Sequence, residues 1–382
     1  MPVPAPPCAA YGPGERLARL RLARTRRVGP VAFHALLARF GGAEAALAAL
    51  PELARRGGGA TPVPPSAAAA ERACAEARRR GASLVVWGDA AYPRLLARIP
   101  DAPGVLTCIG DPGRAAAPCV AIVGARNASA NGQRFARLLA GELAAAGAVV
   151  VSGLARGIDT AAHEGAGAAA TIAVVAGGAD IVYPPENAAL QDAIGRAGGA
   201  IFAEMPFGTP PQAHLFPRRN RIVAGLCAAT IVVEATLRSG SLITARLALD
   251  QGREVLAVPG FPLDPRAAGP NALLRDGAAP ATCAADILAV LPPADDTPRA
   301  PERSVQASVP GEKTDLDQMD DTRRRILAAL GTAPAPVDEV LRRCHLSAPS
   351  AQLALLELEL AGRLQRHPGN QVSLVAQDGT GS

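Results

Sequence analysis

The middle of the chain, from residue 119 to residue 290, alternates short apolar runs with stretches of helical periodicity. The runs are rich in Val, Ile and Ala and lack strict alternation of apolar and polar positions, which is typical of strands buried on both faces. Intervening helices predict parallel strands joined by right-handed crossovers. We therefore expect an α/β fold, a Rossmann-like doubly wound parallel sheet. The runs are CVAIVG (119–124), AVVVSG (148–153), TIAVVAG (171–177), AIFAE (200–204), TIVVEA (230–235) and EVLAVPG (254–260). A shorter run, Leu84 to Trp87, predicts a lead-in attached to this sheet.

Apolar residues at helical spacing fill the N-terminal segment, residues 15–80, and predict a small helical domain of the SAM-like or helix-hairpin-helix kind. Glycine turns at Val28-Gly29-Pro30 and Phe40-Gly41-Gly42 punctuate its helices. In a DNA-binding hairpin, a GxG turn exposes backbone N–H groups to phosphate. Here Pro30 and Val31 follow Gly29, so the second glycine and one donor are missing. The pattern favours helix packing over DNA contact at this hairpin.

The C-terminal part returns to helical periodicity after a stretch rich in proline and charge, residues 292–318, that is typical of a linker. Residues 319–376 contain three helical patterns, TRRRILAAL, PVDEVLRRC and SAPSAQLALLELELAGRL, and then the strand-like QVSLV. Three helices and a two-stranded wing predict a winged helix. We therefore divide the chain into a helical domain (1–80), a Rossmann-like domain (81–291), a linker (292–318) and a winged-helix domain (319–376).

The third helix of this winged helix carries Glu357 and Glu359 and has little arginine on its exposed face. A helix that reads the major groove usually displays polar and basic side chains. We therefore expect protein contact or a structural role for this helix. Four arginines nearby leave a phosphate-contacting role open: Arg342, Arg343, Arg363 and Arg366.

Composition narrows the class of protein. Apolar residues make up 49% and charged residues 19% of the 382 residues, which is ample for a folded core. We see no uncharged apolar stretch of the roughly 20 residues that a membrane helix needs, and no secretory signal, so we expect a cytoplasmic protein. The seven cysteines are scattered without CxxC pairs, so we expect neither zinc sites nor a disulfide framework.

The net charge of +5 is unevenly distributed, because residues 1–80 carry 13 basic and 5 acidic side chains. Lys313 is the single lysine, and every other basic residue is an arginine. Arginine presents a planar fork that binds phosphate through two hydrogen bonds and stacks on bases. A net positive charge alone is a weak indication of nucleic-acid binding.

Glycine-rich or polar turns follow several of the predicted strands, at the edge of the sheet where open α/β folds bind ligands. Small residues let backbone N–H groups approach an anion, and helix N-termini add a partial positive charge. Arginines in and between these turns, Arg126, Arg156, Arg218, Arg219 and Arg221, add full charges. The pattern predicts an extended anion-binding rim that fits a nucleotide or a nucleic-acid backbone.

Small-molecule cofactors fit this rim poorly. GARNAS after the first strand lacks the second glycine of the dinucleotide fingerprint, and the phosphate-loop pattern GxxxxGK[ST] is absent. Catalytic candidates are few. His163 follows Asp159 by four residues, but this spacing is more typical of a helix start in which Asp159 is the N-cap. Glu204 and Glu234 end strands at the ligand edge and are candidate general bases. We expect no catalytic residue, metal or cofactor.

An ordered set of motifs from residue 120 to 290 resembles the DNA-processing protein A family, also called DprA or Smf. The matching pieces are VAIVGARNAS, VVSGLARGIDTAAH, TIAVVAGGADIVYPPEN, FPRRNRIVAGL, VVEATLRSGSLITARLALDQGREVLAVPG and GPNALLRDGA. The helical domain and the winged helix also fit the family's architecture, so the resemblance spans nearly the full chain. Where many members have a lysine before the RN pair, this sequence has Arg218-Arg219, which keeps the charge.

The resemblance implies sequence-independent binding of single-stranded DNA in a basic pocket, and loading of the recombinase RecA onto incoming DNA in natural transformation and homologous recombination. It also implies a homodimer, with single-strand-binding protein as a further partner. Phe216 is a candidate for stacking on a base. By motif, the DNA-binding residues are Gly124, Arg126, Ser152, Gly153, Arg156, Gly157, Phe216, Arg218, Arg219, Asn220, Arg221, Ser239, Gly240 and Ser241.

Two other hypotheses remain open. A nucleotide-hydrolysing Rossmann enzyme of the lysine-decarboxylase-like type carries a PGGxGTxxE signature, whereas this chain has AGGADIVYPPE without the Gly-Thr pair. A transcription regulator would use the winged helix on a specific duplex and the Rossmann domain as a nucleotide sensor. Turnover of a nucleoside monophosphate would establish the enzyme, and equal binding to scrambled duplexes would exclude the regulator.

Overall fold

The computed structural model describes residues 11–292, 316–367 and 369–375. Within these residues the chain forms two compact units. Residues 72–292 form the first unit, and residues 11–71 together with 316–375 form the second. Most of the linker expected at 292–318 lies outside the described residues.

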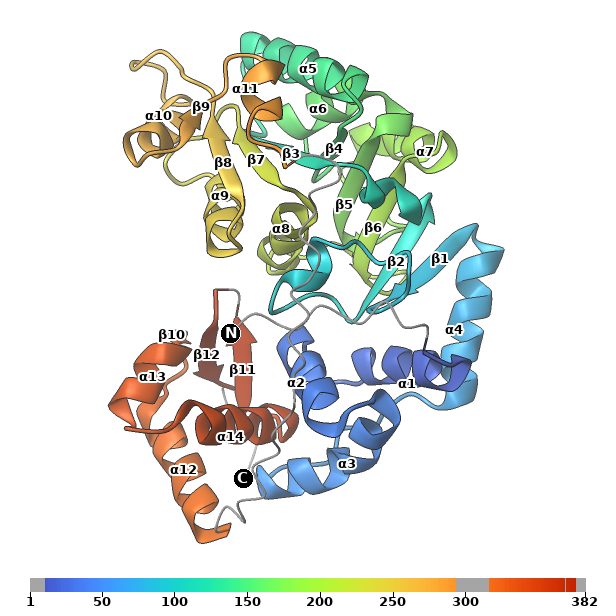
Figure 1. Cartoon of the computed structure of the whole chain (residues 1–382), viewed down its shortest axis with the longest axis vertical. Helices are drawn as coiled ribbons and strands as arrows, with labels where there is room; N and C mark the ends of the chain where they lie inside the picture. The colour runs from blue at the N-terminus through green and yellow to red at the C-terminus, as the bar shows by residue number, and fades with distance from the viewer. Residues whose placement is uncertain (1–10, 293–315, 368, 376–382) are drawn as a thin grey trace. The chain divides into compact units, whose positions relative to one another are not determined.

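The first unit is built on a nine-stranded sheet of order β1-β2-β6-β5-β4-β3-β7-β8-β9 (Figure 1). The strands from β6 to β9 in this order are all parallel. This confirms the doubly wound sheet that the apolar runs predict. The strands are β1 (Ala82–Val86), β2 (Val105–Gly110), β3 (Cys119–Val123), β4 (Val149–Ser152), β5 (Thr171–Gly178), β6 (Ala200–Met205), β7 (Ala229–Val232), β8 (Glu254–Ala257) and β9 (Ala279–Pro280).

The end of the sheet formed by β1 and β2 is antiparallel: β1 pairs with β2, and β2 pairs with β6. The lead-in expected from Leu84 to Trp87 therefore belongs to a hairpin that extends the parallel sheet. We did not predict its second strand, because nothing local in VLTCIG indicates that its partner is β6, about ninety residues further along the chain.

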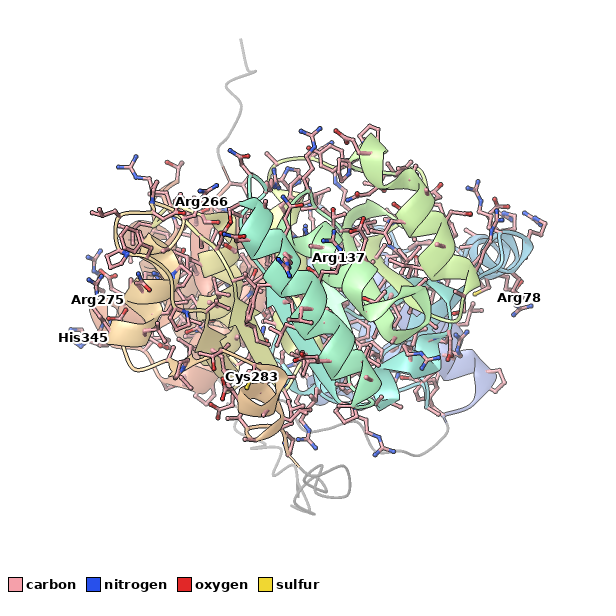
Figure 2. The ribbon with its side chains drawn as sticks, turned by 90° about the horizontal axis from the view of Figure 1, so that it is seen from above. Arg78, Arg137, Arg266, Arg275, Cys283 and His345 are labelled. Atoms are coloured by element: carbon pink, nitrogen blue, oxygen red, sulfur yellow. The ribbon has the colours of Figure 1, made fainter. Side chains whose placement is uncertain are left out.

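Helices cover both faces of the sheet (Figure 1). Alternate side chains of one strand point to opposite faces, so Val120 and Ile122 of β3 pack on one side with helices α5 and α6. Figure 2 looks onto this side, where Arg137 lies on the outer surface of α5 and pairs with Glu164 of α6. The helices of this unit are α4 (Ala67–Arg79), which begins in the second unit, α5 (Ala130–Ala145), α6 (Ile158–Ala166), α7 (Ala188–Arg196), α8 (Leu215–Leu226), α9 (Gly240–Asp250), α10 (Ala268–Arg275) and α11 (Ala284–Leu288).

The chain runs outward from β3 through β4 and β5 to β6, and then returns to place β7 on the other side of β3. Neighbouring loops leave the sheet in opposite directions at this point, so a crevice opens beyond the ends of β3 and β7. The fold thus places the turn after Val123 and the turn after Val232 at the position where open α/β sheets bind ligands.

The second unit joins the N-terminal helices to the winged helix. Its N-terminal part contains α1 (Pro13–Ala23), α2 (Pro30–Phe40) and α3 (Ala43–Arg56), as the periodicity predicts. Its C-terminal part contains α12 (Leu316–Ala329), α13 (Val337–Arg343), α14 (Ala348–Leu360) and the strands β10 (Ala335–Pro336), β11 (Leu364–His367) and β12 (Gln371–Leu374). The sheet order is β10-β12-β11, so the expected two-stranded wing gains a short third strand.

Among the described helices, none alone has the length and apolar character of a membrane span. The pair α2 and α3 passes that test only when taken together, and the two helices are bent by 107° relative to each other.

Candidate functional site

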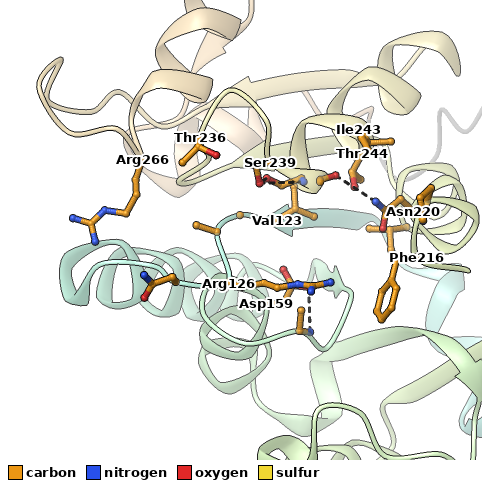
Figure 3. Close-up of a pocket in the computed structure, with 18 of the residues that line it drawn as sticks. Val123, Arg126, Asp159, Phe216, Asn220, Thr236, Ser239, Ile243, Thr244 and Arg266 are labelled. Carbon is orange, nitrogen blue, oxygen red and sulfur yellow. Dashed lines mark hydrogen bonds between the residues drawn. The ribbon is translucent and has the colours of Figure 1, made fainter. Parts of the chain in front are cut away.

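A cavity of about 750 Å³ lies at the crevice beyond β3 and β7 (Figure 3). Its walls come from the loops after β3, β4, β7 and β8, from α8, and from the start of α9. Of the residues predicted to bind DNA, eight line it: Gly124, Arg126, Phe216, Arg219, Asn220, Ser239, Gly240 and Ser241. The topology thus brings together side chains that are up to 117 positions apart in the sequence.

Arg126 extends from the β3–α5 loop into the cavity and is exposed (Figure 3). Its guanidinium lies over the ring of Phe216, with 5.2 Å between Cζ and the ring centroid. The Phe216 ring also lies 5.7 Å from the ring of Tyr183, centroid to centroid. A cation and two aromatic faces therefore share one corner of the site. This is the combination that holds single-stranded nucleic acid through phosphate contact and base stacking.

The opposite wall is the N-terminus of α9. Ser239 is the N-cap, and its Oγ accepts a hydrogen bond from the backbone N–H of Ser241. Asn220 of α8 donates to the carbonyl of Gly240 across 3.4 Å, which ties the two helices together. An added Cβ at Gly240 would meet nothing within 4 Å. The open helix N-terminus presents partial positive charge to an anion in the cavity.

Arg219 lies beneath the rim and is only 7% exposed. Its guanidinium packs against Gly153 so closely that a Cβ there would lie 1.5 Å from Nη1. Burial lowers the pKa of Arg219, and the nearby Asp159 carboxylate opposes that shift. The like charge of Arg126 lowers the pKa of Arg219 further. An anion that enters the cavity would therefore relieve the repulsion between two arginines.

Asp159 also lines the cavity, although we expected it to be a helix cap. That expectation is wrong: the N-cap of α6 is Gly157, at φ +76°, and Asp159 lies in the first turn. The Oδ2 atom of Asp159 accepts hydrogen bonds from the backbone N–H groups of Gly153 and Ala155. Burial raises the pKa of Asp159, and Arg219 opposes this shift. Asp159 thus shapes the β4–α6 turn and holds a countercharge near Arg219.

A second cavity, of about 410 Å³, adjoins the first and shares Arg126 and Phe216 with it. Two more of the predicted residues, Gly153 and Arg156, line this cavity, and Arg156 pairs with Glu186 at 2.5 Å. Sequence reasoning did not select Tyr183, which also lines it. Tyr183 belongs to the family-like motif TIAVVAGGADIVYPPEN, and an aromatic side chain after a strand of the ligand edge was a usable signal.

Four predicted residues line neither cavity: Ser152, Gly157, Arg218 and Arg221. Ser152 is buried, and its Oγ donates to the carbonyl of Ile122. Gly157 brings two backbone segments together, since a Cβ there would lie 2.3 Å from the carbonyl oxygen of Ala125. Arg218 is partly exposed and lies 3.9 Å from Glu204.

Arg221 is 3% exposed and is held by carboxylates in the interior. Its Nη2 lies 2.5 Å from Oε1 of Glu204, and its Nε lies 3.6 Å from Oδ2 of Asp101. These two carboxylates raise the pKa of Arg221 against the effect of burial. In the described structure Arg221 anchors α8 to strand β6 and to the loop that contains Asp101.

The candidate general bases have structural partners. Glu204 pairs with Arg221, and Glu234 accepts hydrogen bonds from the backbone N–H and Oγ of Ser129 at the start of α5. His163 is buried, and its Nδ1 lies 2.7 Å from Oγ1 of Thr171. Within residues 11–292, 316–367 and 369–375, the structure brings together no group of three or more His, Cys, Asp or Glu side chains able to hold a metal.

Three family profiles match the chain. They are described as DNA recombination-mediator protein A (residues 83–292), the DprA-like N-terminal HHH domain (13–75) and the DprA winged helix domain (306–370). Protein Smf of Escherichia coli is 41% identical over 288 residues, which cover 74% of this chain and 75% of that protein.

Solved structures show the same relationship. The crystal structure of DNA processing protein A from Streptococcus pneumoniae matches with a TM-score of 0.62 and 32% identity, over 74% of this chain and 99% of that one. A structure of the Helicobacter pylori protein, described by its single-stranded DNA binding mode, matches with a TM-score of 0.48 and 34% identity, over 52% and 89%. The identity to Smf and the three profiles in chain order establish that the chain belongs to the DprA/Smf family of DNA recombination-mediator proteins.

Proposed function

We propose that this protein binds single-stranded DNA without sequence preference in the cavity beyond β3 and β7. The observation that carries the proposal is the corner where Arg126 lies over Phe216, facing the N-terminus of α9. Arginine and helix dipole attract phosphate, and the aromatic face accepts any base. The cavity contacts we describe do not require a particular base edge, so sequence preference is not part of the proposal.

We further propose that the bound strand is handed to the recombinase RecA during natural transformation and homologous recombination, in the cytoplasm. Family membership supports this step, with single-strand-binding protein as a second partner. The activity is binding and transfer, with no bond made or broken by the protein.

A homodimer completes the proposal, because two cavities on one long strand raise the apparent affinity through effective concentration. Large exposed apolar side chains between residues 237 and 263 support it. Leu237 is 64%, Phe261 69% and Leu263 83% exposed. A second copy of the chain is the partner that would cover them. Sedimentation of the wild type and of Phe261→Glu/Leu263→Glu tests this, since the variant should sediment as a monomer.

The experiment that tests the binding site is fluorescence anisotropy with a labelled dT oligonucleotide at several salt concentrations. Arg126→Ala should weaken binding and reduce its salt dependence. Arg137→Ala is the matched control, because Arg137 is an exposed arginine of the same domain on the outer face of α5 (Figure 2). Equal effects of the two variants would refute the proposed site.

A further inference from the structure

A third cavity, of about 540 Å³, lies within the second unit. It opens between the end of α3, the helix α12 and the turn after α14. Arg56, Arg323, Arg324 and Arg363 line it, with Asp320 as the one carboxylate among the described lining residues. The four arginines come from three separate segments, so the tertiary structure rather than a local charge run brings them together.

The helix α14 is closed off on both sides. Its residues from Ala354 to Leu360 are all buried. One side packs into the winged-helix core through Leu355 and Leu358. The other side meets the N-terminal helices, since a Cβ at Gly57 would lie 2.1 Å from the carbonyl oxygen of Glu357. This helix therefore cannot enter a DNA groove while the unit keeps this structure, as its lack of arginine suggested.

The acidic side chains of α14 are neutralised inside the unit. Glu357 pairs with Arg323, and Glu359 pairs with Arg366 at 2.8 Å. Burial raises the pKa of Glu357, and the charges of Arg323, Arg56 and Arg39 oppose this shift. Arg323 also pairs with the exposed Asp320, so two carboxylates already bind its guanidinium.

The other three arginines of the cavity form weaker ion pairs or none among the described residues. Arg56 pairs with Glu52 at 2.8 Å, and Arg324 lies 3.4 Å from Asp321, both at exposed positions. Exposed pairs of this kind contribute little to stability, so a phosphate can displace them. Arg363 forms no ion pair with any carboxylate of the described residues. Its Nη1 lies 3.5 Å from the position that a Cβ on Gly58 would occupy. Gly57 and Gly58 leave the wall without side chains, which permits close approach of a ligand.

We infer that this cavity is a second nucleic-acid site, which takes phosphodiester groups of a strand through Arg56, Arg324 and Arg363. Guanidinium forks suit phosphate, and three of them on separate elements can contact successive groups of one backbone. The winged helix then contributes to DNA binding through this cavity, at its contact with the N-terminal helices, and not through α14. The inference goes beyond the proposed function and rests on it only in that the chain handles nucleic acid.

The test uses the full-length protein carrying Arg126→Ala, so that the Rossmann site is already weakened. The triple variant Arg56→Ala/Arg324→Ala/Arg363→Ala is added to it, and binding of a labelled dT oligonucleotide is titrated at several salt concentrations. The matched control triple, Arg26→Ala/Arg55→Ala/Arg325→Ala, removes the same charge at exposed positions of the same unit outside the cavity.

We expect the cavity triple to weaken residual binding by roughly tenfold and to lower the salt slope by about 2, since each lost phosphate contact on a single strand contributes about 0.7. The control triple should change neither. Equal effects of both triples would overturn the inference, because net charge alone would then explain them. An Arg-to-Lys triple at the cavity positions should keep the salt slope, which separates lost contacts from misfolding.

A free phosphate anion shares the chemistry of a strand. Inorganic tripolyphosphate is therefore titrated into the Arg126→Ala protein and its cavity triple, with the melting temperature as readout. Stabilisation that requires the cavity arginines, together with oligonucleotide binding that does not, would overturn the strand assignment. Binding of Arg126→Ala compared with wild type in the same titrations reports separately on the Rossmann site.

Discussion

The guanidinium carbon of Arg126 lies 5.2 Å from the centroid of the Phe216 ring. Arg126 lies in the loop after β3, and Phe216 is the second residue of α8. The doubly wound topology brings these two distant segments into contact. A phosphate held by the arginine places its neighbouring base within reach of the ring. Charge and stacking surface are thus presented to adjacent parts of one nucleotide.

The ring of Phe216 gives the first prediction. Phe216→Ala should weaken binding of a dT oligonucleotide by about 1–3 kcal/mol, which is the usual contribution of stacking one base. Phe216→Tyr keeps the aromatic face and should bind like the wild type. Anisotropy titrations with an oligonucleotide of abasic sites complete the test. If Phe216→Ala weakens binding to the abasic strand just as much, the ring does not act by stacking.

Arg221 gives the second prediction, which separates fold from binding. Its side chain is 3% exposed and pairs with Glu204, so Arg221→Met should cost about 3–5 kcal/mol of stability by breaking a largely buried ion pair. Arg126→Ala should stay within about 0.5 kcal/mol of the wild type, because Arg126 is exposed. Urea unfolding measures both. An Arg221 variant that is as stable as the wild type but no longer binds DNA would show that Arg221 contacts DNA directly.

The contrast between Arg126 and Arg221 shows what the sequence could predict. Runs of Val and Ile predicted all the central parallel strands, because a strand buried on both faces has a local signature. Glycine-rich turns predicted which edge of the sheet holds the cavity. The sequence could not separate a cavity-lining arginine from an anchoring one within RRNR. That distinction depends on Glu204 and Asp101, which lie 17 and 120 residues away from Arg221. For the same reason the antiparallel strand β2 was missed.

Gly153 gives the third prediction. A Cβ at this position would lie 1.5 Å from Nη1 of Arg219, so Gly153→Ala must displace a buried guanidinium. We expect a loss of about 1–3 kcal/mol in stability, as for an overpacked core, and weaker DNA binding because the cavity floor changes. Gly240→Ala is the control for stability, since its Cβ would meet nothing within 4 Å. Thermal melting that leaves the two variants equally stable would contradict the packing described for Arg219.

His163 gives a prediction about pH. Burial lowers the pKa of His163 to about 3, and the positive charge of Arg219 adds to the effect. The unfolded chain binds a proton near the ordinary pKa of about 6.5, so it binds more protons than the folded state between these two values. This residue's contribution to stability is therefore complete above pH 6.5 and is lost as the pH falls towards 3, at up to about 1.4 kcal/mol per pH unit.

The measurement is the difference in unfolding free energy between the wild type and His163→Asn across this pH range. The asparagine keeps a polar partner for Thr171 and removes the titrating group. Taking the difference cancels groups common to both proteins. A difference that does not change with pH would show that His163 titrates normally in the folded protein.

The last prediction concerns the contact between the end of α3 and helix α14. A Cβ at Gly57 would lie 2.1 Å from the carbonyl oxygen of Glu357, a backbone atom that cannot rotate away. Gly57→Ala should therefore push α14 from the N-terminal helices and lower the stability of the second unit by about 1–3 kcal/mol. Gly12→Ala, in the same unit with nothing within 4 Å of its Cβ, is the control. Hydrogen exchange localises the effect: faster exchange in both α3 and α14 is expected, because each helix covers the other. Faster exchange in α3 alone would mean that the winged helix is stable without its contact to the helical domain, and that α14 can be exposed at little cost.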